Sequence, residues 1–128
     1  MPLVRIDVTQ GRTDEELTLL ADTIQQVLIE TFTTPKLDRY QIIHEHRPGL
    51  IKALDTGLGY PRTDKLVVLQ ITQQGRTTAQ KQAMYALMSK RLEEIGIPST
   101  DLIISVTENT KEDWSFGLGK AQFLTGDL

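Results

Sequence analysis

The 128-residue chain contains no cysteine, which excludes a disulfide framework and any chemistry that depends on a thiol. It also has no apolar run near the ~20 residues that a membrane-spanning helix needs. Even its longest apolar runs, such as 66–69, are short. The first residues, Met-Pro-Leu-Val-Arg-Ile-Asp, do not form a basic segment followed by an apolar one, so no secretory signal is predicted. We therefore expect a cytoplasmic protein that does not associate with membranes.

An excess of basic residues is missing as well. The chain has 14 lysines and arginines against 17 aspartates and glutamates, a formal net charge of −3. A general nucleic-acid binder usually presents a basic stripe, so no nucleic-acid partner is expected. The length suits one domain with a single modest hydrophobic core, which we place at 1–128.

An internal repeat organises the chain. Residues of the first half recur in the second at a spacing of 63, or of 64 around the helix start. The matched pairs include Leu3 and Leu66, Val4 and Val67, Thr9 and Thr72, Gln10 and Gln73, Arg12 and Arg76, Asp38 and Asp101, and Glu45 and Glu108. The repeat predicts two similar units, about 2–46 and 65–109, followed by a tail at 110–128. The segment between the units is rich in glycine and proline and is typical of a loop connection.

Each unit has the pattern of a β-α-β motif. Short apolar and β-branched stretches predict strands at 2–8, 40–46, 66–72 and 102–107. Capping boxes at 13–16 and 77–80 open two helices, and apolar residues then recur at helical spacing. Gly96 is placed to end the second helix in a left-handed conformation. The expected fold class is α+β, a tandem β-α-β repeat whose four-stranded sheet carries both helices on one face.

Two helices on one face leave the other face of the sheet uncovered. We expect an apolar surface there, which assembly into a homo-oligomer would cover. The tail holds Trp114, Phe116 and Phe123 among glycines, which is too apolar for a free tail. We expect it to form a short hairpin that packs on a neighbouring subunit.

The start at Pro2, the duplicated unit and the stretch 73–77 resemble the tautomerase superfamily, and within it the malonate semialdehyde decarboxylase family. Further similar segments are Asp-Arg-Tyr-Gln at 38–41, Asp-Thr-Gly-Leu-Gly at 55–59, Asp-Trp-Ser-Phe-Gly at 113–117 and Gln-Phe-Leu-Thr-Gly-Asp at 122–127. The likeness covers nearly the whole chain. It implies the tautomerase fold, a homotrimer, no metal and no organic cofactor. It also implies that Pro2 becomes the amino terminus once Met1 is removed.

An amino-terminal proline is a secondary amine of restricted geometry. Near an apolar wall and a cation its ammonium form is disfavoured, so its pKa falls. The neutral amine can take a proton next to a carbonyl, or attack the carbonyl to form an iminium, whereas the ammonium can donate a proton. Pro2 is therefore the predicted central catalytic group.

The topology brings two further catalytic candidates toward Pro2. If the two units run antiparallel in the sheet, Arg76 lies near Pro2 and just before a helix N-terminus, where it suits a substrate carboxylate. Asp38 precedes the strand parallel to the first, so it is expected at the same end. Their repeat partners Arg12 and Asp101 have no amino terminus beside them. A purely structural role is therefore the alternative for both residues. In it, Arg76 only braces the helix start and Asp38 is only a turn residue.

Three residues are candidates for substrate binding. The family resembled here carries two arginines that flank one residue; the second corresponds to Arg76, whereas the first falls at Gln74. Glutamine can hydrogen-bond a small carboxylate substrate but supplies no charge, so we expect weaker carboxylate binding. Trp114 and Phe116 either wall the substrate pocket or fill a subunit interface.

Three functions are consistent with these residues. The resemblance implies a cofactor-independent lyase or isomerase that decarboxylates or hydrates small oxo acids, with minor tautomerase activity. The alternatives are an enol–keto tautomerase of 2-oxo acids and a non-catalytic oligomeric binding module. His44 and His46 share a strand face but have no obvious third ligand. A polar strand face or an oligomer contact is therefore a better prediction for them than a metal site.

Overall fold

The computed structural model describes all 128 residues and contains two β-α-β units. The first comprises β1 (Pro2–Thr9), α1 (Asp14–Phe32) and β2 (Tyr40–His46); the second comprises β3 (Val67–Gln74), α2 (Thr78–Glu94) and β4 (Leu102–Asn109). Three short helical turns complete the chain, η1 (Ser99–Asp101), η2 (Lys111–Asp113) and α3 (Gln122–Thr125). No helix is long and apolar enough to cross a membrane.

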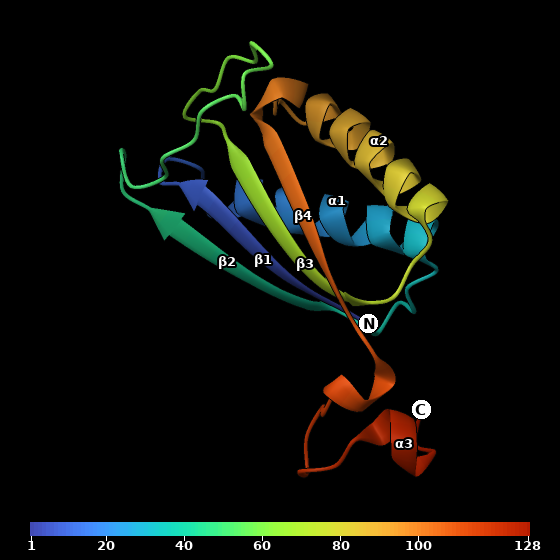
Figure 1. Ribbon diagram of the computed structural model, residues 1–128. Helices are drawn as coiled ribbons and strands as arrows, with labels where there is room; N and C mark the ends of the chain where they lie inside the picture. The colour runs from blue at the N-terminus through green and yellow to red at the C-terminus, as the bar shows by residue number, and fades with distance from the viewer.

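The four strands form one mixed sheet in the order β2-β1-β3-β4 (Figure 1). The strands are parallel within each unit, and β1 is antiparallel to β3 at the centre. Both long helices cover the same face of the sheet (Figure 1). The predicted tandem β-α-β repeat, with one four-stranded sheet and both helices on one face, is therefore confirmed.

Both predicted capping boxes are present and fix where the long helices begin. The Thr13 hydroxyl accepts a hydrogen bond from the Glu16 amide at 3.1 Å, and the Glu16 carboxylate accepts one from the Thr13 amide at 3.1 Å. Thr77 and Gln80 repeat the arrangement at the start of α2, at 3.1 and 2.9 Å. After α2, Gly96 has a φ of 95°, a left-handed conformation that glycine adopts without steric cost.

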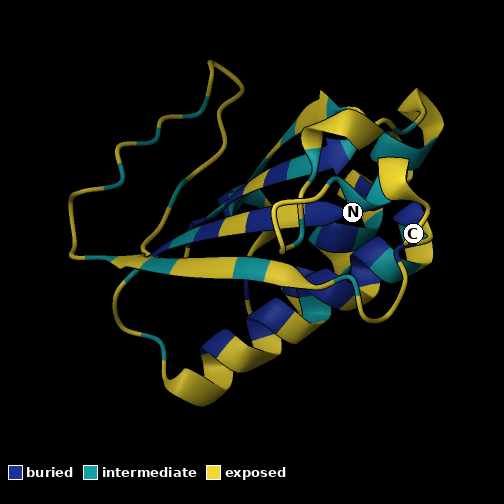
Figure 2. Ribbon diagram, turned by 90° about the horizontal axis from the view of Figure 1, so that it is seen from below, coloured by how far each residue is buried: buried dark blue, intermediate teal, exposed yellow.

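The core lies between the sheet and the two helices, where the buried residues gather (Figure 2). Alternate residues of the two central strands face the helices and are at most 1% exposed: Val4, Ile6, Val8, Val67, Leu69 and Ile71. They contact an apolar stripe from the helices that includes Leu20, Ile24, Leu28, Phe32, Met84, Met88 and Leu92. This two-layer core holds β1 and β3 in fixed register, so the start of β1 at Pro2 stays beside the end of β3.

The open face of the sheet is more polar than expected. Alternation along β1 and β3 places Arg5, Asp7, Gln70 and Thr72 on this face, with Leu3 as one of its few apolar members. The prediction of an uncovered apolar sheet face was therefore wrong in composition. Large apolar side chains that are more than half exposed lie mostly outside the strands. Those in the connection 47–64 and in the tail are Leu50, Leu54, Leu58, Leu118, Leu124 and Leu128.

The tail also differs from the expected hairpin. It consists of the helical turns η2 and α3 and extends beyond the end of the sheet where the chain begins (Figure 1). Asp113 ends the first turn, and its carboxylate reaches back to the residue that precedes the turn: it accepts hydrogen bonds from the Thr110 backbone amide at 2.8 Å and the Thr110 hydroxyl at 3.0 Å. Gly126, at a φ of 88°, follows the second turn. Local capping thus replaces strand pairing in this segment.

Candidate active site

The sheet register brings three predicted site residues to one end of the molecule. Pro2 is paired with Gln73 in the antiparallel β1–β3 ladder, so the start of the chain lies beside the end of β3. Arg76 lies in the short loop between β3 and α2, just past that end. Asp38 comes two residues before β2, and the parallel pairing of β1 with β2 places it at the same end.

The amino terminus is buried at this end and is influenced by both charged candidates. Met1 is only 6% exposed. Burial is the main cause that lowers the pKa of its amine; the positive charge of Arg76 lowers it further, and the negative charge of Asp38 partly offsets both. Pro2, Arg76 and Asp38 therefore surround the position where a terminal amine experiences desolvation and opposing charges.

Arg76 braces the backbone and keeps part of its guanidinium available. Its Nε donates to the Phe32 carbonyl at 3.1 Å, and its Nη1 donates to the carbonyls of Gln74 and Gly75 at 2.9 and 3.1 Å. Its guanidinium carbon lies 5.6 Å from the centre of the Phe32 ring. The Nη2 group makes no hydrogen bond within the chain, and partial burial lowers the pKa of the side chain. The arginine can thus brace the helix start and still bind an anion.

Asp38 carries an uncommitted carboxylate. Its backbone carbonyl accepts a hydrogen bond from the side-chain Nε2 of Gln25 at 3.1 Å, which fixes the chain, but the Asp38 side chain has no hydrogen-bond partner. Burial raises the pKa of the carboxyl group, and the nearby terminal ammonium opposes that rise. A partly buried carboxyl group without a partner is suited to exchanging a proton or to orienting a cationic amine.

The remaining predicted residues lie on the open face at the same end. The indole of Trp114 donates to the Asn109 side chain at 2.8 Å, and Asn109 is the cross-strand neighbour of Gln74. The Phe116 ring stacks on Trp114 at 5.5 Å and on Tyr40 at 5.7 Å between ring centres. Pro2 and Gln73 belong to the helix-facing side instead, so the two groups of residues meet only around the strand ends.

Gln73 is a site residue to which the sequence assigned no role. Its side chain is fully buried, and neither its amide nitrogen nor its amide oxygen has a hydrogen-bond partner in the chain. It continues the helix-facing row of Val67, Leu69 and Ile71 and lies opposite Pro2. The signal was visible in the sequence as a polar residue at an apolar position of the alternation. Such a group is costly in a core, so it is a candidate substrate contact.

Replacing this amide with an apolar side chain of similar shape should therefore stabilise the protein. We expect Gln73→Met to raise the free energy of unfolding by about 1–3 kcal/mol, the usual desolvation cost of an unpaired amide. Urea denaturation at fixed protein concentration measures the change, and Gln70→Met on the exposed side of the same strand is the matched control. Destabilisation by Gln73→Met alone would mean that the amide is hydrogen-bonded in solution.

His44 and His46 belong to a polar network on the open face. Their rings lie 6.5 Å apart, and His46 Nε2 is 2.7 Å from a carboxylate oxygen of Asp7. Asp7 also accepts a hydrogen bond from Arg5 at 2.9 Å. No cluster of three or more histidine, aspartate or glutamate side chains has the geometry to hold a metal ion.

Comparisons with known proteins agree on the family of the chain. Two family models, each described as "Tautomerase enzyme", match residues 2–59 and 38–117. The probable tautomerase YrdN of Bacillus subtilis (strain 168) is 52% identical over 100% of both chains. A malonate semialdehyde decarboxylase, with structures that address its decarboxylase and hydratase activities, is 42% identical with a TM-score of 0.96 over 98% of both chains. The FG41 malonate semialdehyde decarboxylase inhibited by 3-bromopropiolate is also 42% identical, with a TM-score of 0.94 over 98% of this chain and 97% of the other.

Proposed function

Because the chain belongs to the tautomerase family, we propose that it is a cofactor-independent enzyme that acts on small oxo acids through the amine of Pro2. The observation that carries the proposal is the buried amino terminus, whose pKa responds to Arg76 and Asp38. In the mature enzyme Met1 is removed, and the prolyl nitrogen becomes a basic secondary amine. Two solved structures that are 42% identical to this chain are malonate semialdehyde decarboxylases, which favours decarboxylation or hydration as the main reaction and enol–keto tautomerisation as a minor one.

Each side chain then has a chemical task. Arg76 binds the substrate carboxylate through its free Nη2 group, and Gln74 adds an uncharged hydrogen bond. Asp38 holds the prolyl ammonium by charge attraction. The buried amide of Gln73, next to Pro2, can hydrogen-bond the substrate where the core offers it no partner. Trp114 and Phe116 supply an apolar wall.

In the decarboxylation of a 3-oxo acid, Pro2 must help the substrate carbonyl to accept an electron pair. The bond between the carboxylate carbon and the adjacent carbon breaks, and its electron pair moves toward the carbonyl as carbon dioxide leaves. The prolyl ammonium can donate a proton to the carbonyl oxygen and so stabilise the enol that forms. Alternatively, the neutral prolyl amine attacks the carbonyl carbon, water leaves, and the resulting iminium accepts the electron pair as an enamine. In either route a proton then reaches the carbon that lost the carboxylate. In the second route, water finally hydrolyses the iminium and releases the product and the free prolyl amine.

A tautomerase is the second candidate, because the relative that is 52% identical to this chain is named a probable tautomerase. In that reaction the neutral prolyl amine moves a proton between the oxygen and the carbon of an enol. A non-catalytic binding module is the third, and it differs from both enzymes in needing no free prolyl amine.

The state of the amino terminus tests the proposal against the binding module. We expect mass spectrometry of the protein from its native host to show a chain that begins at Pro2, because an amide nitrogen has no basicity. A form that retains Met1, made with the processing enzyme inhibited, should be inactive on oxo acids. Equal activity in the two forms would exclude the prolyl amine as the reacting group.

We also propose that the protein is a homotrimer, as the family resemblance implies. Support comes from the exposed leucines of the connection and tail, of which Leu54 is 89% and Leu118 is 91% exposed. Apolar side chains this exposed are typical of surfaces covered by a partner. Light scattering at micromolar concentration should give three times the chain mass, whereas a stable monomer would contradict the prediction.

A further inference from the structure

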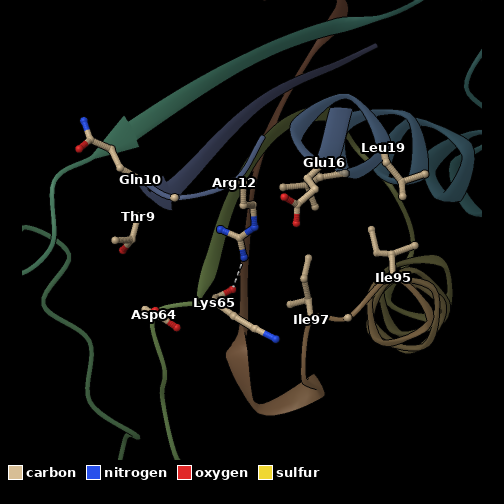
Figure 3. Close-up of a pocket in the computed structure, with 12 residues that line it drawn as sticks. Thr9, Gln10, Arg12, Glu16, Leu19, Asp64, Lys65, Ile95 and Ile97 are labelled. Carbon is tan, nitrogen blue, oxygen red and sulfur yellow. Dashed lines mark hydrogen bonds between the residues drawn. The ribbon is translucent and has the colours of Figure 1, made fainter. Parts of the chain in front are cut away.

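A cavity lies at the opposite end of the sheet from Pro2. It has a volume of about 290 Å³ and is lined by residues from the end of β1, the start of α1, the residues before β3 and the loop after α2. The guanidinium of Arg12 lies at its centre, and the side chains of Glu16, Leu19, Ile95 and Ile97 surround it (Figure 3). We call this cavity the Arg12 pocket.

The internal repeat relates the Arg12 pocket to the candidate active site. Arg12 is the repeat counterpart of Arg76, and each precedes the threonine that caps its helix. Because the two units run antiparallel, the counterpart arginine lies at the far end of the sheet. The chain continues there through Lys65 into β3, so this end has no terminal amine. The pocket therefore keeps the anion-binding arginine without the reacting group.

Asp101 is the repeat counterpart of Asp38, and its carboxylate already accepts hydrogen bonds within the chain. Asp101 is fully buried and accepts a hydrogen bond from the Thr63 amide at 2.7 Å and another from the Thr63 hydroxyl. Its carboxylate is thus committed to holding the connection in place. Asp101 does not neutralise Arg12 by direct contact, which leaves the arginine without a paired carboxylate.

Arg12 has more free hydrogen-bonding capacity than Arg76. Its only hydrogen bond runs from Nη2 to the Lys65 carbonyl at 2.7 Å (Figure 3), whereas Arg76 makes three to the backbone. Burial is the main cause that lowers the pKa of Arg12, and the negative charges of Glu16, Asp64 and Asp101 oppose that effect. A desolvated guanidinium with most of its N–H groups free, facing a cavity, is a strong donor for an anion.

We propose that the Arg12 pocket binds a small organic monocarboxylate with an apolar tail. The carboxylate accepts hydrogen bonds from the free N–H groups of Arg12, and the tail lies against Leu19, Ile95 and Ile97. The charged side chains that line the cavity are Arg12 and Lys65 on one side and Glu16 and Asp64 on the other, so their formal charges cancel. A monoanion then adds one net negative charge to the cavity, whereas a dianion adds two. The pocket therefore selects monoanions over dianions, and its binding does not depend on chemistry at Pro2.

Methyl NMR of the full-length protein tests this site directly. The probe is 3-phenylpropionate, compared with 3-phenylpropanol, which lacks the charge, and with phenylmalonate, which has a second carboxylate. We expect saturable shifts of the Ile95 and Ile97 methyl signals with the monocarboxylate, and at least about tenfold weaker binding of the alcohol, which cannot form the charge-assisted hydrogen bonds. Equal binding of acid and alcohol, or shifts confined to Ile71 near the Pro2 end, would overturn the proposal.

Paired arginine variants assign the response to one pocket. Arg12→Met should weaken the binding reported by Ile95 and Ile97 by about tenfold or more. Arg76→Met should leave that binding unchanged, because Arg76 lies at the other end of the sheet. If Arg12→Met fails to fold, the same titration is made with Arg12→Lys. This variant keeps the positive charge but loses the planar guanidinium, so it should also bind the monocarboxylate more weakly than the unchanged protein. Full affinity in either Arg12 variant together with equal binding of the alcohol would show that the arginine is only a backbone brace.

Discussion

Arg76→Ala should remove most activity toward carboxylate substrates while leaving a folded protein. The arginine has a free Nη2 group and no paired carboxylate, so its loss removes a positioned, charge-assisted hydrogen bond to substrate. Such a loss should cost on the order of 2–4 kcal/mol in transition-state binding, a fall in kcat/KM of about 30- to 1,000-fold. Steady-state kinetics with a small oxo acid measures the change.

The bracing role of Arg76 needs a control, because its bond to the Phe32 carbonyl ties the end of α1 to the start of α2. Arg91→Ala removes another arginine that links the two helices, through hydrogen bonds of 3.0 and 2.9 Å to Glu30, but its charge is not among those that shift the pKa of the terminal amine. Activity should survive in Arg91→Ala, and Arg76→Lys should recover part of it because the charge is kept. If the loss in Arg76→Ala follows the fraction of unfolded protein, the arginine has only a structural role.

The fold was predictable because several local signals agree. Two capping boxes, two apolar helical stripes and the 63-residue repeat all specify the same pair of β-α-β units. Antiparallel placement of those units then predicts that Arg76 approaches Pro2, and the register shows this arrangement. A fold can be predicted from a sequence when its local patterns and its long-range pattern specify the same structure.

Two features required information that topology alone does not supply. The open face was expected to be apolar because helices cover only one side of the sheet, but Arg5, Asp7 and Gln70 alternate with the core residues. The tail was expected to be a hairpin because of its glycines. Instead, the hydrogen bond from the Thr110 backbone amide to the Asp113 carboxylate stabilises a helical turn. In both segments, the polar side chains at a few positions determined the local structure, and the expected arrangement of strands and helices did not predict it.

Gln73 shows why part of the site was missed. A glutamine in a strand is unremarkable until the register places it opposite Pro2 on the buried face. Its importance comes from burial without a hydrogen-bond partner, which is a property of the folded chain. Polar residues at apolar positions of an otherwise alternating strand are therefore worth testing as substrate contacts.

The protonation state of Pro2 should decide which reaction dominates. Burial and Arg76 lower the pKa of an amine at this end of the sheet, and Asp38 raises it. A secondary prolyl amine is intrinsically more basic than the primary amine of Met1, and Gln74 adds no charge to lower its pKa further. Although burial and Arg76 lower the pKa of a terminal amine here, we expect the greater basicity of the secondary amine and the negative charge of Asp38 to keep Pro2 substantially protonated near neutral pH, which favours acid-assisted decarboxylation or hydration. Tautomerisation of an enol such as phenylenolpyruvate should be detectable but slow.

The pH dependence follows from these roles. Decarboxylation that uses the prolyl ammonium is retained below the pKa of Pro2 and declines as pH rises through it. Tautomerisation that uses the neutral amine rises over the same interval. An NMR titration of the Pro2 nitrogen, compared with both pH–rate profiles, measures whether all three share one midpoint. A pKa well below neutrality together with fast enol turnover would reverse the ranking and identify the enzyme as a tautomerase.

Pro2→Ala separates the amine from its geometry. The variant keeps a terminal amine after Met1 is removed, but the amine is primary and more mobile, so it no longer holds the nitrogen in one orientation toward the substrate. Activity on oxo acids and enols should fall together, by about 100-fold or more, the usual contribution of a positioned acid or base. Thermal unfolding should change little, because the core residues from Val4 onward keep β1 in place. Since both reactions use the same nitrogen, full retention of either in Pro2→Ala would assign that reaction to another group, with Asp38 as the nearest free carboxyl group to examine.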